Sequence, residues 1–381
     1  NKQFDGVSLT QLAVSEAEFA EADALVSDEI KTALKQAKKR IAKWHKAGMS
    51  KSFTVKTAPG VQCGRIIRPI QRVGLYIPAG SAPLPSTVLM LGIPAQLAEC
   101  LDVIICTPPQ KNGQVNPVIL YAAKLCGVQN VYKTGGAQAI AAMALGTESI
   151  GVCAKIFGPG NSYVSTAKQL VQSMPSGPAI DLPAGPSEVL VIADATSKAE
   201  FVAADLLAQA EHGTDSQVVC LCSSKAKLNQ IIREIKKQTN NLPRKEIILN
   251  ALGHARFISC ANVAEAIAIS NQYAPEHLIL SFENAEEALP QIQAAGSVFI
   301  GPWSSESLGD YCSGTNHTLP TNGYARSYSG VSVSSFQLNI STQRISQKGL
   351  QNIGPCALTL AGCEQLDAHA QSVSIRLAAL P

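Results

Sequence analysis

The chain has 381 residues, of which 46% are hydrophobic, 5% aromatic and 15% charged. A chain of this length usually folds as two or three domains, and this much apolar material is typical of packed cores rather than of disorder. The net charge of +3 is too small for a nucleic-acid-binding protein, which needs a concentrated basic patch. No apolar run reaches the roughly 18 residues that span a membrane. We therefore expect neither a nucleic acid nor a membrane as a partner.

The 11 cysteines indicate a reducing environment rather than a disulfide framework. Their number is odd, the chain is long, and several lie in apolar runs such as residues 103–106. We therefore expect buried free thiols and a cytoplasmic location. Cys220 and Cys222 share one face of a predicted strand, but without a second pair they indicate a metal site only weakly.

The first part of the chain predicts amphipathic helix. Ser27 is suited to be an N-cap, with acidic residues directly after it. The apolar residues that follow recur at helical spacing and form one stripe: Ile30, Leu34, Ala37, Ile41 and Trp44. The basic residues between positions 35 and 46 then lie on the solvated face, which explains them better than phosphate binding does.

From about Arg65, short apolar runs alternate with longer, Ala-rich helical patterns. The strand-like runs are residues 73–77, 101–106, 130–132, 155–157, 188–193 and 218–222. Such alternation is typical of α/β proteins with parallel sheets. Residues 332–381 have a mainly helical pattern and predict a small C-terminal unit.

Three glycine-containing turns lie where a predicted strand passes into a helix: Gly80, Gly135–Gly136 and Gly158–Pro159–Gly160. Turns of this kind direct unpaired backbone N–H groups and the positive end of a helix toward a ligand. None matches G-x-G-x-x-G, and tight strand-to-helix turns need glycine whatever their function, so any single turn is more simply structural. Three of them together favour a nucleotide or phosphate site.

Two pairs of residues suit metal binding or acid–base chemistry. Gln209 and His212 share one face of the helix predicted from 198 to 211, although a histidine that caps this helix is the simpler interpretation. Glu276 and His277 precede a predicted strand. They suit a water activator and a general base, or equally an ordinary surface pair.

Two further segments carry similar groups. The glycine-rich loop 309–317 includes Asp310 and His317 and is dense in side chains of the kind that bind ligands. Glu364 and His369 lie on a helical pattern near the C-terminus, where exposure to solvent is the simpler interpretation.

Three classes of function remain open on the residues alone. The first is an enzyme that uses both a nucleotide bound at the glycine turns and the polar residues. The second is a zinc hydrolase, in which Glu211 or Glu276 activates metal-bound water but the glycine turns have no role. The third is a nucleotide-binding module without catalysis, which does not need Glu276 and His277 beside a metal site.

Over essentially its whole length the sequence resembles the histidinol dehydrogenase family. Four ordered stretches carry the resemblance: 180–189 (IDLPAGPSEV), 209–213 (QAEHG), 273–278 (YAPEHL) and 313–317 (SGTNH). The resemblance implies zinc-dependent oxidation of L-histidinol to L-histidine through L-histidinal, the final part of histidine biosynthesis. Two molecules of NAD⁺ accept the four electrons, one hydride each.

The family's functional residues carry over where the motifs match. The catalytic pair is Glu276 and His277. The ligands of one Zn²⁺ per subunit are Gln209, His212, Asp310 and His369. The substrate contacts are Ser187, His317 and Glu364, together with His277 and the four zinc ligands. The NAD⁺ contacts are Tyr76, Gln138 and Asn161.

The resemblance also implies the architecture: two intertwined, incomplete Rossmann-like α/β domains with parallel sheets, and a small helical C-terminal unit. We place residues 1–76 and 190–331 in the first α/β domain, with the zinc and catalytic residues. We place 77–189 in the second, on the NAD⁺ side, and 332–381 in a helical dimerisation unit.

The family is homodimeric, with each active site built from both subunits. The unit that carries Glu364 and His369 would then reach into the partner's site. Family members have a further helical segment ahead of the position of Asn1, so we expect part of the dimer packing to lie outside this sequence. The loop 111–116 is expected to be a few residues longer than in other members.

Overall fold

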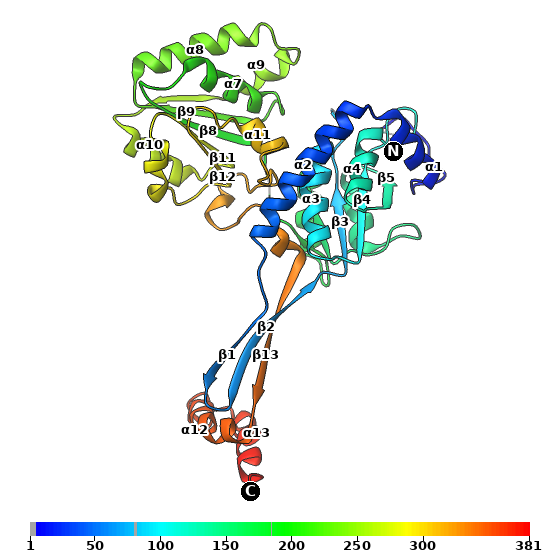
Figure 1. Cartoon of the computed structure of the whole chain (residues 1–381), viewed down its shortest axis with the longest axis vertical. Coiled ribbons are helices and arrows are strands. Elements are labelled where there is room, and N and C mark those ends of the chain that lie inside the picture. The colour runs from blue at the N-terminus through cyan, green and yellow to red at the C-terminus, as the bar shows by residue number, and fades with distance from the viewer. Residues whose placement is uncertain (1–4, 80–81, 184) are drawn as a thin grey trace. The chain divides into compact units, whose positions relative to one another are not determined.

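The computed structural model describes residues 5–79, 82–183 and 185–381, which form two compact units (Figure 1). The first unit comprises Asn1–Gly48 and Ile70–Phe336, and the second comprises Met49–Pro69 and Gln337–Pro381. Within the described ranges, no helix combines the length and the apolar character needed to cross a membrane.

The first unit contains two five-stranded sheets, and all strands within each are parallel (Figure 1). One sheet has the order β5-β4-β3-β6-β7. Its strands are β3 (Arg72–Tyr76), β4 (Asp102–Thr107), β5 (Asn130–Lys133), β6 (Lys155–Phe157) and β7 (Ala179–Ile180). Counted along the chain this order is 3-2-1-4-5, the arrangement of a Rossmann fold.

Six helices accompany this sheet: α1 (Glu16–Leu25), α2 (Asp28–Ala47), α3 (Pro85–Leu97), α4 (Pro117–Leu125), α5 (Gly136–Leu145) and α6 (Ser162–Gln172). α5 packs on α6, α1 packs on α4, and α3 contacts both α2 and α4. The predicted N-cap of α2 is confirmed, because the Ser27 hydroxyl accepts from Ile30 N. The apolar stripe of α2 is buried at its centre, but Trp44 is 47% exposed and the neighbouring His45 is buried instead.

The second sheet repeats the same strand order as β10-β9-β8-β11-β12. Its strands are β8 (Glu188–Ala193), β9 (Gln217–Cys222), β10 (Arg256–Ser259), β11 (His277–Ser281) and β12 (Ser297–Ile300). The accompanying helices are α7 (Ala199–Ala210), α8 (Lys225–Thr239), α9 (Lys245–Leu252), α10 (Val263–Tyr273) and α11 (Glu306–Tyr311). Three short 3₁₀ helices follow in the same unit: η1 (Ala285–Gln291), η2 (Tyr324–Arg326) and η3 (Val333–Phe336).

The central strand β8 shows why this sheet is covered on both faces. Every residue of β8 is buried. Val189 and Val191 belong to the core formed with α7 and α8, whereas Leu190 and Ile192 belong to the core formed with α10. Because successive strand residues point to opposite faces, a continuous apolar run is the pattern that a doubly covered parallel strand requires.

The boundaries between the two α/β parts differ from those we expected. Residues 72–76 form the central strand of the first sheet and not part of the second, and α1 and α2 also pack on helices of the first sheet. The second sheet begins with Glu188, two residues earlier than expected. An apolar run indicates that a strand is buried, but it carries no information about which sheet the strand joins.

The second unit is a three-stranded antiparallel sheet with two helices. The strands, in the order β1-β2-β13, are β1 (Phe53–Ala58), β2 (Val61–Pro69) and β13 (Gln337–Ile345), and the helices are α12 (Gln347–Cys363) and α13 (Asp367–Ala378). We expected 332–381 to be mainly helical and missed β13 there, as well as β1 and β2 earlier in the chain. β1 and β13 are largely exposed and β2 is mostly half-buried, and all three mix polar with apolar residues, so they lack the clean alternation that predicts a strand.

One turn of the second unit depends on a glycine. Gly60 lies between β1 and β2 with a φ of +83°, and a Cβ atom there would come within 2.5 Å of Gly349 N in α12. The Gly60 carbonyl also accepts from Ser346 N at 2.9 Å. This close approach fixes the start of α12 against the β1–β2 turn.

Candidate active site

Glu276 and His277 lie where α10 passes into β11, and the main chain of a neighbouring strand holds both. α10 ends at Ala274 in the left-handed conformation, and β11 starts at His277 after Pro275. At the start of β8, the backbone N–H of Glu188 donates to Glu276 Oε2 at 2.8 Å. The carbonyl of the same residue lies 3.1 Å from His277 Nδ1. A carbonyl only accepts, so Nδ1 carries a hydrogen and Nε2 is the nitrogen available to take a proton.

Three carboxylates surround the imidazole of His277. Nδ1 lies 3.7 Å from Glu276 Oε2 and 3.8 Å from Glu306 Oε1, and Nε2 lies 3.6 Å from Asp310 Oδ1. Burial alone would lower the pKa of His277, but Glu306, Glu276 and Asp310 outweigh it and raise the pKa well above the usual imidazole value. Burial raises the pKa of Glu276 to about 7. A carboxyl group with such a pKa can exchange protons near neutral pH.

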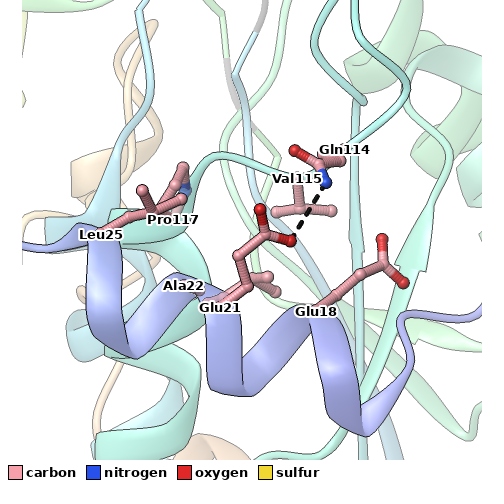
Figure 2. Close-up of a pocket in the computed structure, with 8 residues that line it drawn as sticks. Glu18, Glu21, Ala22, Leu25, Gln114, Val115 and Pro117 are labelled. Atoms are coloured by element: carbon pink, nitrogen blue, oxygen red, sulfur yellow. Dashed lines mark hydrogen bonds between the residues drawn. The ribbon is translucent and has the colours of Figure 1, made fainter.

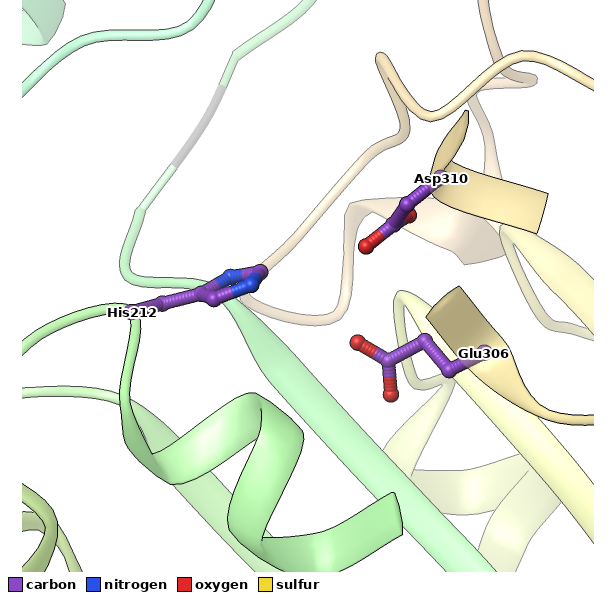
Figure 3. Close-up of side chains that lie close together, drawn as sticks. All are labelled: His212, Glu306 and Asp310. Carbon is purple, nitrogen blue, oxygen red and sulfur yellow. The ribbon is translucent and has the colours of Figure 1, made fainter. Parts of the chain in front are cut away.

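A metal-type cluster adjoins this pair. The ligand atoms of His212, Glu306 and Asp310 all lie within 4.8 Å of one another, and Figure 3 shows the imidazole and the two carboxylates pointing toward a common space. Glu306 and Asp310 are four residues apart on α11, which places them on one face of that helix. Burial opposes ionisation of Asp310, yet His277 outweighs it and lowers the pKa of Asp310.

His212 supplies the nitrogen of this cluster from the segment directly after α7. The residue has solvent-exposed surface, but the surrounding protein removes enough hydration to lower the pKa of its imidazole. A neutral imidazole offers a lone pair, which is the form that binds a metal ion.

Gln209 lies one helical turn before His212, near the end of α7. Its side chain is fully buried, and neither Oε1 nor Nε2 has a hydrogen-bond partner among the described residues. An unpaired amide at such a position is costly, because it has lost its hydration without gaining a partner. The orphaned Oε1 is therefore a group that a cation would satisfy. His212, Glu306 and Asp310 offer one nitrogen and two carboxylates, a set of donors that fits a divalent metal.

Two of the expected substrate residues lie nearby in the first unit. His317 is joined to Asp310, because its Nδ1 lies 3.0 Å from the Asp310 carbonyl oxygen. Ser187 is partly exposed directly before β8, and its carbonyl accepts from Gln217 N at 2.9 Å. The other two expected residues, Glu364 and His369, belong to the second unit, where both are exposed.

The expected NAD⁺ residues lie at the carboxyl edge of the first sheet. Tyr76 ends β3, and its hydroxyl accepts from Gly136 N at 3.1 Å, at the start of α5. Gln138 is exposed in the first turn of α5. Asn161 is the N-cap of α6, with its Oδ1 accepting from Val164 N. The two described glycine turns thus open onto one edge, whereas Gly80 of the third turn is outside the described residues.

Gly158 shows how closely the β6–α6 turn approaches β3. Its φ is +120°, and a Cβ atom would lie 2.1 Å from the carbonyl oxygen of Tyr76. The buried ion pair Lys168–Asp181 holds this turn from the other side: Asp181 accepts from Gly158 N at 2.8 Å, and Lys168 donates to Gly158 O at 2.9 Å. No residue with a side chain fits at position 158.

The candidate functional residues lie at opposite edges of the two sheets, at the carboxyl ends of strands in the first and at the amino ends in the second. In Rossmann-type sheets a ligand binds beyond the carboxyl ends of the strands, where the strand order reverses. Tyr76 ends β3 and Gly158 directly follows β6, so the expected NAD⁺ residues lie at this edge of the first sheet. Glu188 and His277 instead stand at the amino ends of β8 and β11.

Sequence reasoning missed two residues of the site. Glu306 has a buried carboxyl group 3.8 Å from His277 Nδ1 and close to Asp310, and burial raises its pKa. Its spacing of four residues from Asp310 was a usable signal. Glu188 acts through its main chain, and no pattern of side chains predicts that.

A hollow elsewhere in the first unit has a different character. It lies between α1 and the loop that precedes α4, and its polar groups include Glu18, Glu21 and Gln114 (Figure 2). These groups are paired: Gln114 Nε2 donates to Glu21, and Glu18 accepts from Lys133 Nζ. The hollow therefore holds no comparable cluster of acid–base groups.

Two Rossmann-ordered sheets, with glycine turns at one edge and a buried Glu–His pair beside a metal-type cluster, define the class of an α/β oxidoreductase. A family model described as histidinol dehydrogenase matches residues 1–377. The chain therefore belongs to the histidinol dehydrogenase family, the oxidoreductases of histidine biosynthesis.

Individual histidinol dehydrogenases are similar in sequence to this chain over nearly its whole length. The histidinol dehydrogenase of Xanthomonas axonopodis pv. citri (strain 306) is 58% identical over 374 residues, which is 98% of this chain and 86% of that protein. The one from Vibrio vulnificus (strain YJ016) is 50% identical over 376 residues, 99% of this chain and 86% of that protein.

Among solved structures, a histidinol dehydrogenase is again highly similar to this chain. The crystal structure of histidinol dehydrogenase from Elizabethkingia anophelis superposes with a TM-score of 0.96 at 54% identity, covering 99% of this chain and 87% of that one. An acetylating aldehyde dehydrogenase from Geobacillus thermoglucosidasius shares the fold alone, with a TM-score of 0.53 and 12% identity over 87% of this chain and 86% of that one.

Proposed function

We propose that this chain oxidises L-histidinol to L-histidine with NAD⁺ as the electron acceptor, and that it does so with one Zn²⁺ held beside the Glu276–His277 pair. The observation that carries the metal is the fully buried Gln209 amide, which has no hydrogen-bond partner among the described residues and lies one turn from His212. Gln209, His212 and Asp310 would hold the ion from within one subunit. His369 would complete the set, and Ser187, His317 and Glu364 would contact the substrate.

The metal's contribution would be to hold the substrate. L-Histidinol carries an imidazole and an amine, both nitrogen donors that suit borderline-soft Zn²⁺. When bound, Zn²⁺ supplies a fixed anchor for these nitrogens and leaves the hydroxymethyl group free to react. The alternative is that the metal polarises the reacting oxygen as a Lewis acid. The two nitrogen donors of the substrate favour the first role, in which the metal holds the substrate in place.

NAD⁺, when bound, accepts a hydride from carbon, and the complete oxidation requires two such transfers. Tyr76, Gln138 and Asn161 would contact it at the carboxyl edge of the first sheet. The close approach at Gly158 and the exposed side chains of Gln138 and Asn161 support a ligand along this edge.

His277 would act in the first oxidation. The alcohol must lose its hydroxyl proton as the hydride leaves, and Nε2 is the nitrogen that its hydrogen bond to Glu188 leaves available. The three nearby carboxylates favour the protonated imidazole, which cannot act as a base. A cation held by Asp310 and His212 would offset the charge of Asp310, one of the three carboxylates, and so would favour the neutral imidazole that can act as a base.

Glu276 would act in the second oxidation. L-Histidinal has no hydride to give until water adds to its carbonyl, because only the hydrate bears both a hydroxyl group and a transferable hydrogen on the same carbon. Glu276, with a pKa near 7, can take a proton from that water. The hydrate then loses a hydride and its remaining protons to give the carboxylate.

The second unit supports a homodimer with shared sites. Among its residues only Val61, Gly349, Gly354 and Ala361 are buried. Large apolar side chains are exposed on its strands and helices, including Leu338, Leu360 and Ile375. A sheet and two helices with so small a core need a partner surface. A second copy would cover these side chains and bring His369 and Glu364 to its partner's site.

We also propose a cytoplasmic location. All 11 cysteines are free thiols, and six of them are buried in the interior of the first unit. Free thiols in this number suit a reducing compartment.

One assay tests the central proposal. The purified protein is mixed with L-histidinol and NAD⁺, and NADH absorbance is followed before and after treatment with a chelator and again after Zn²⁺ is restored. We expect two NADH per histidine formed, loss of activity with the chelator and recovery with Zn²⁺. NADH formation that is indifferent to complete metal removal would refute the metal's role, and one NADH per turnover would refute the four-electron reaction.

A further inference from the structure

A proline inside α3 leaves one carbonyl of that helix without its usual donor. In an α-helix the N–H of each residue bonds the carbonyl four positions earlier. Pro94 is within α3 and has no N–H, so the carbonyl of Met90 lacks this partner. Both residues are buried, and a buried carbonyl must find another donor.

That donor is the side chain of Asn316, from the loop that follows α11. Asn316 Nδ2 lies 2.6 Å from the Met90 carbonyl oxygen, and its Oδ1 accepts from Thr318 N at 2.9 Å. Since the carbonyl only accepts, the orientation of the amide is fixed. Asn316 is 5% exposed, so both bonds are shielded from water.

His45 completes the environment of this amide. Its Nε2 lies 3.3 Å from Asn316 Nδ2, and its side chain is 1% exposed at the end of α2. Because Nδ2 can only donate, the histidine accepts through Nε2 and remains neutral. The loop is thus attached to α2 and α3 together.

The next residue of the loop is attached to the same helix one turn earlier. His317 Nε2 lies 3.2 Å from Thr87 Oγ1, and His317 Nδ1 lies 3.0 Å from the Asp310 carbonyl oxygen. Nδ1 must therefore carry the hydrogen, and the Thr87 hydroxyl donates to Nε2. Both ring nitrogens are engaged, which fixes the tautomer and the plane of the ring.

We propose that Thr87 and Asn316 are positioning residues for the reaction, which hold His317 and the end of α11 in place for the substrate. Thr87 and Met90 lie three residues apart, on one face of α3, and bind consecutive residues of the loop. α3 follows β3 and its residue Tyr76, on the proposed NAD⁺ side, whereas the loop follows Asp310. The hydrogen bonds of Thr87 and Met90 thus connect α3, which follows the proposed NAD⁺ edge, to the segment that carries the proposed metal ligand Asp310. This inference rests on the proposed function of His317 as a substrate contact.

The first test is a pair of substitutions at Thr87. Thr87→Val keeps the shape but removes the hydroxyl, whereas Thr87→Ser keeps the hydroxyl. We expect Thr87→Val to raise KM for L-histidinol about 3- to 10-fold, the range of one neutral hydrogen bond. KM for NAD⁺ should change less than about 2-fold, since neither Thr87 nor His317 is among the proposed NAD⁺ contacts. Thr87→Ser should restore KM for L-histidinol.

A spectrum of the imidazole nitrogens gives a readout that does not depend on turnover. In protein labelled with ¹⁵N-histidine, the Nε2 resonance of His317 should move in Thr87→Val and stay near its parent position in Thr87→Ser. Equal kinetics and an unmoved resonance in Thr87→Val would overturn the proposal. Equal damage in both variants would show that packing at position 87 matters and not the hydrogen bond, and would also overturn it.

The second test restores the missing helix donor. Pro94→Ala supplies an N–H four residues after Met90, which competes with Asn316 for the carbonyl. We expect a KM for L-histidinol at least about 3-fold higher, again the value of a hydrogen bond, with a Tm that is unchanged or higher. An unaltered KM, at a Tm that is unchanged or higher, would contradict the role of this carbonyl. If the parent protein itself forms no NADH from L-histidinol, the proposed function fails, but the ¹⁵N spectrum still decides whether Thr87 orients the ring.

Discussion

Replacing His45 by glutamine should make the protein more tolerant of acid. Burial lowers the pKa of His45 to about 4, whereas an unfolded chain has a histidine pKa of about 6.5. Between these values the unfolded chain binds a proton at position 45 and the folded protein does not. The contribution of neutral His45 to the free energy of unfolding is therefore fully present above about pH 6.5 and is lost as the pH falls toward 4.

The size of the loss follows from the two pKa values. Each unit of difference corresponds to about 1.4 kcal/mol, so lowering the pH from 7 to 4.5 should cost the folded state about 2 kcal/mol through this one group. Glutamine cannot be protonated in this range, and its side-chain oxygen can still accept from Asn316. His45→Gln should therefore lose about 2 kcal/mol less than the parent over the same pH interval.

The assay is urea unfolding of both proteins at pH 7 and pH 4.5, at one protein concentration. Taking the difference between parent and variant at each pH cancels the titration of all other groups, including the metal ligands. His254→Gln is the matched control, because this histidine is exposed after α9. The reasoning is refuted if His45→Gln and the parent lose the same stability between the two pH values.

Three further outcomes follow from the site. Glu276→Gln should leave the formation of L-histidinal from L-histidinol unchanged but slow the oxidation of L-histidinal by about 100-fold or more, the usual contribution of a general base. Stopped-flow NADH absorbance measures both half-reactions, and an equal loss in both would contradict the proposed roles of Glu276 and His277. Glu306→Gln should weaken zinc binding roughly 10- to 100-fold by removing a carboxyl group that can ionise beside the proposed ligands. Metal content after dialysis measures this; the surface variant Glu246→Gln should match the parent, and full zinc retention in Glu306→Gln would rule out this role. Mixing His212→Ala chains with His369→Ala chains should restore part of the activity, since one site of the heterodimer would hold both intact ligands, and verified heterodimers without activity would count against shared sites.

The sequence predicted those parts of the fold that depend on local pattern. The apolar runs at 73–77 and 188–193 became the central strands β3 and β8, because parallel strands covered on both faces must be apolar throughout. The glycine turns before α5 and α6 also lie where expected. By contrast, β1 and β13 are largely exposed, so no apolar pattern distinguished them from loop or helix.

The remaining parts of the site depend on contacts that are distant in the sequence. Thr87 and His317 are 230 residues apart, and no spacing rule connects them. The sequence also did not predict that His45 rather than Trp44 is buried on α2. A buried histidine needs a polar partner, and here that partner is Asn316, 271 residues away. Glu276, His277, His212 and Asp310 were predicted as site residues because they mark the family, whereas Glu306 was not predicted.

Glu188 bonds both Glu276 and His277, the proposed catalytic pair, and this has a consequence for how the protein tolerates mutation. Its N–H and its carbonyl are main-chain groups, present whatever side chain stands at that position, proline excepted. What they require is the pairing of β8 with β11, in which His277 stands opposite Val189. A slip of one residue between the two strands would misplace Glu276 and His277 together while leaving the composition of the core nearly unchanged. Turnover is therefore a sensitive reporter of strand register, and it should be lost in misregistered folding intermediates that are already compact.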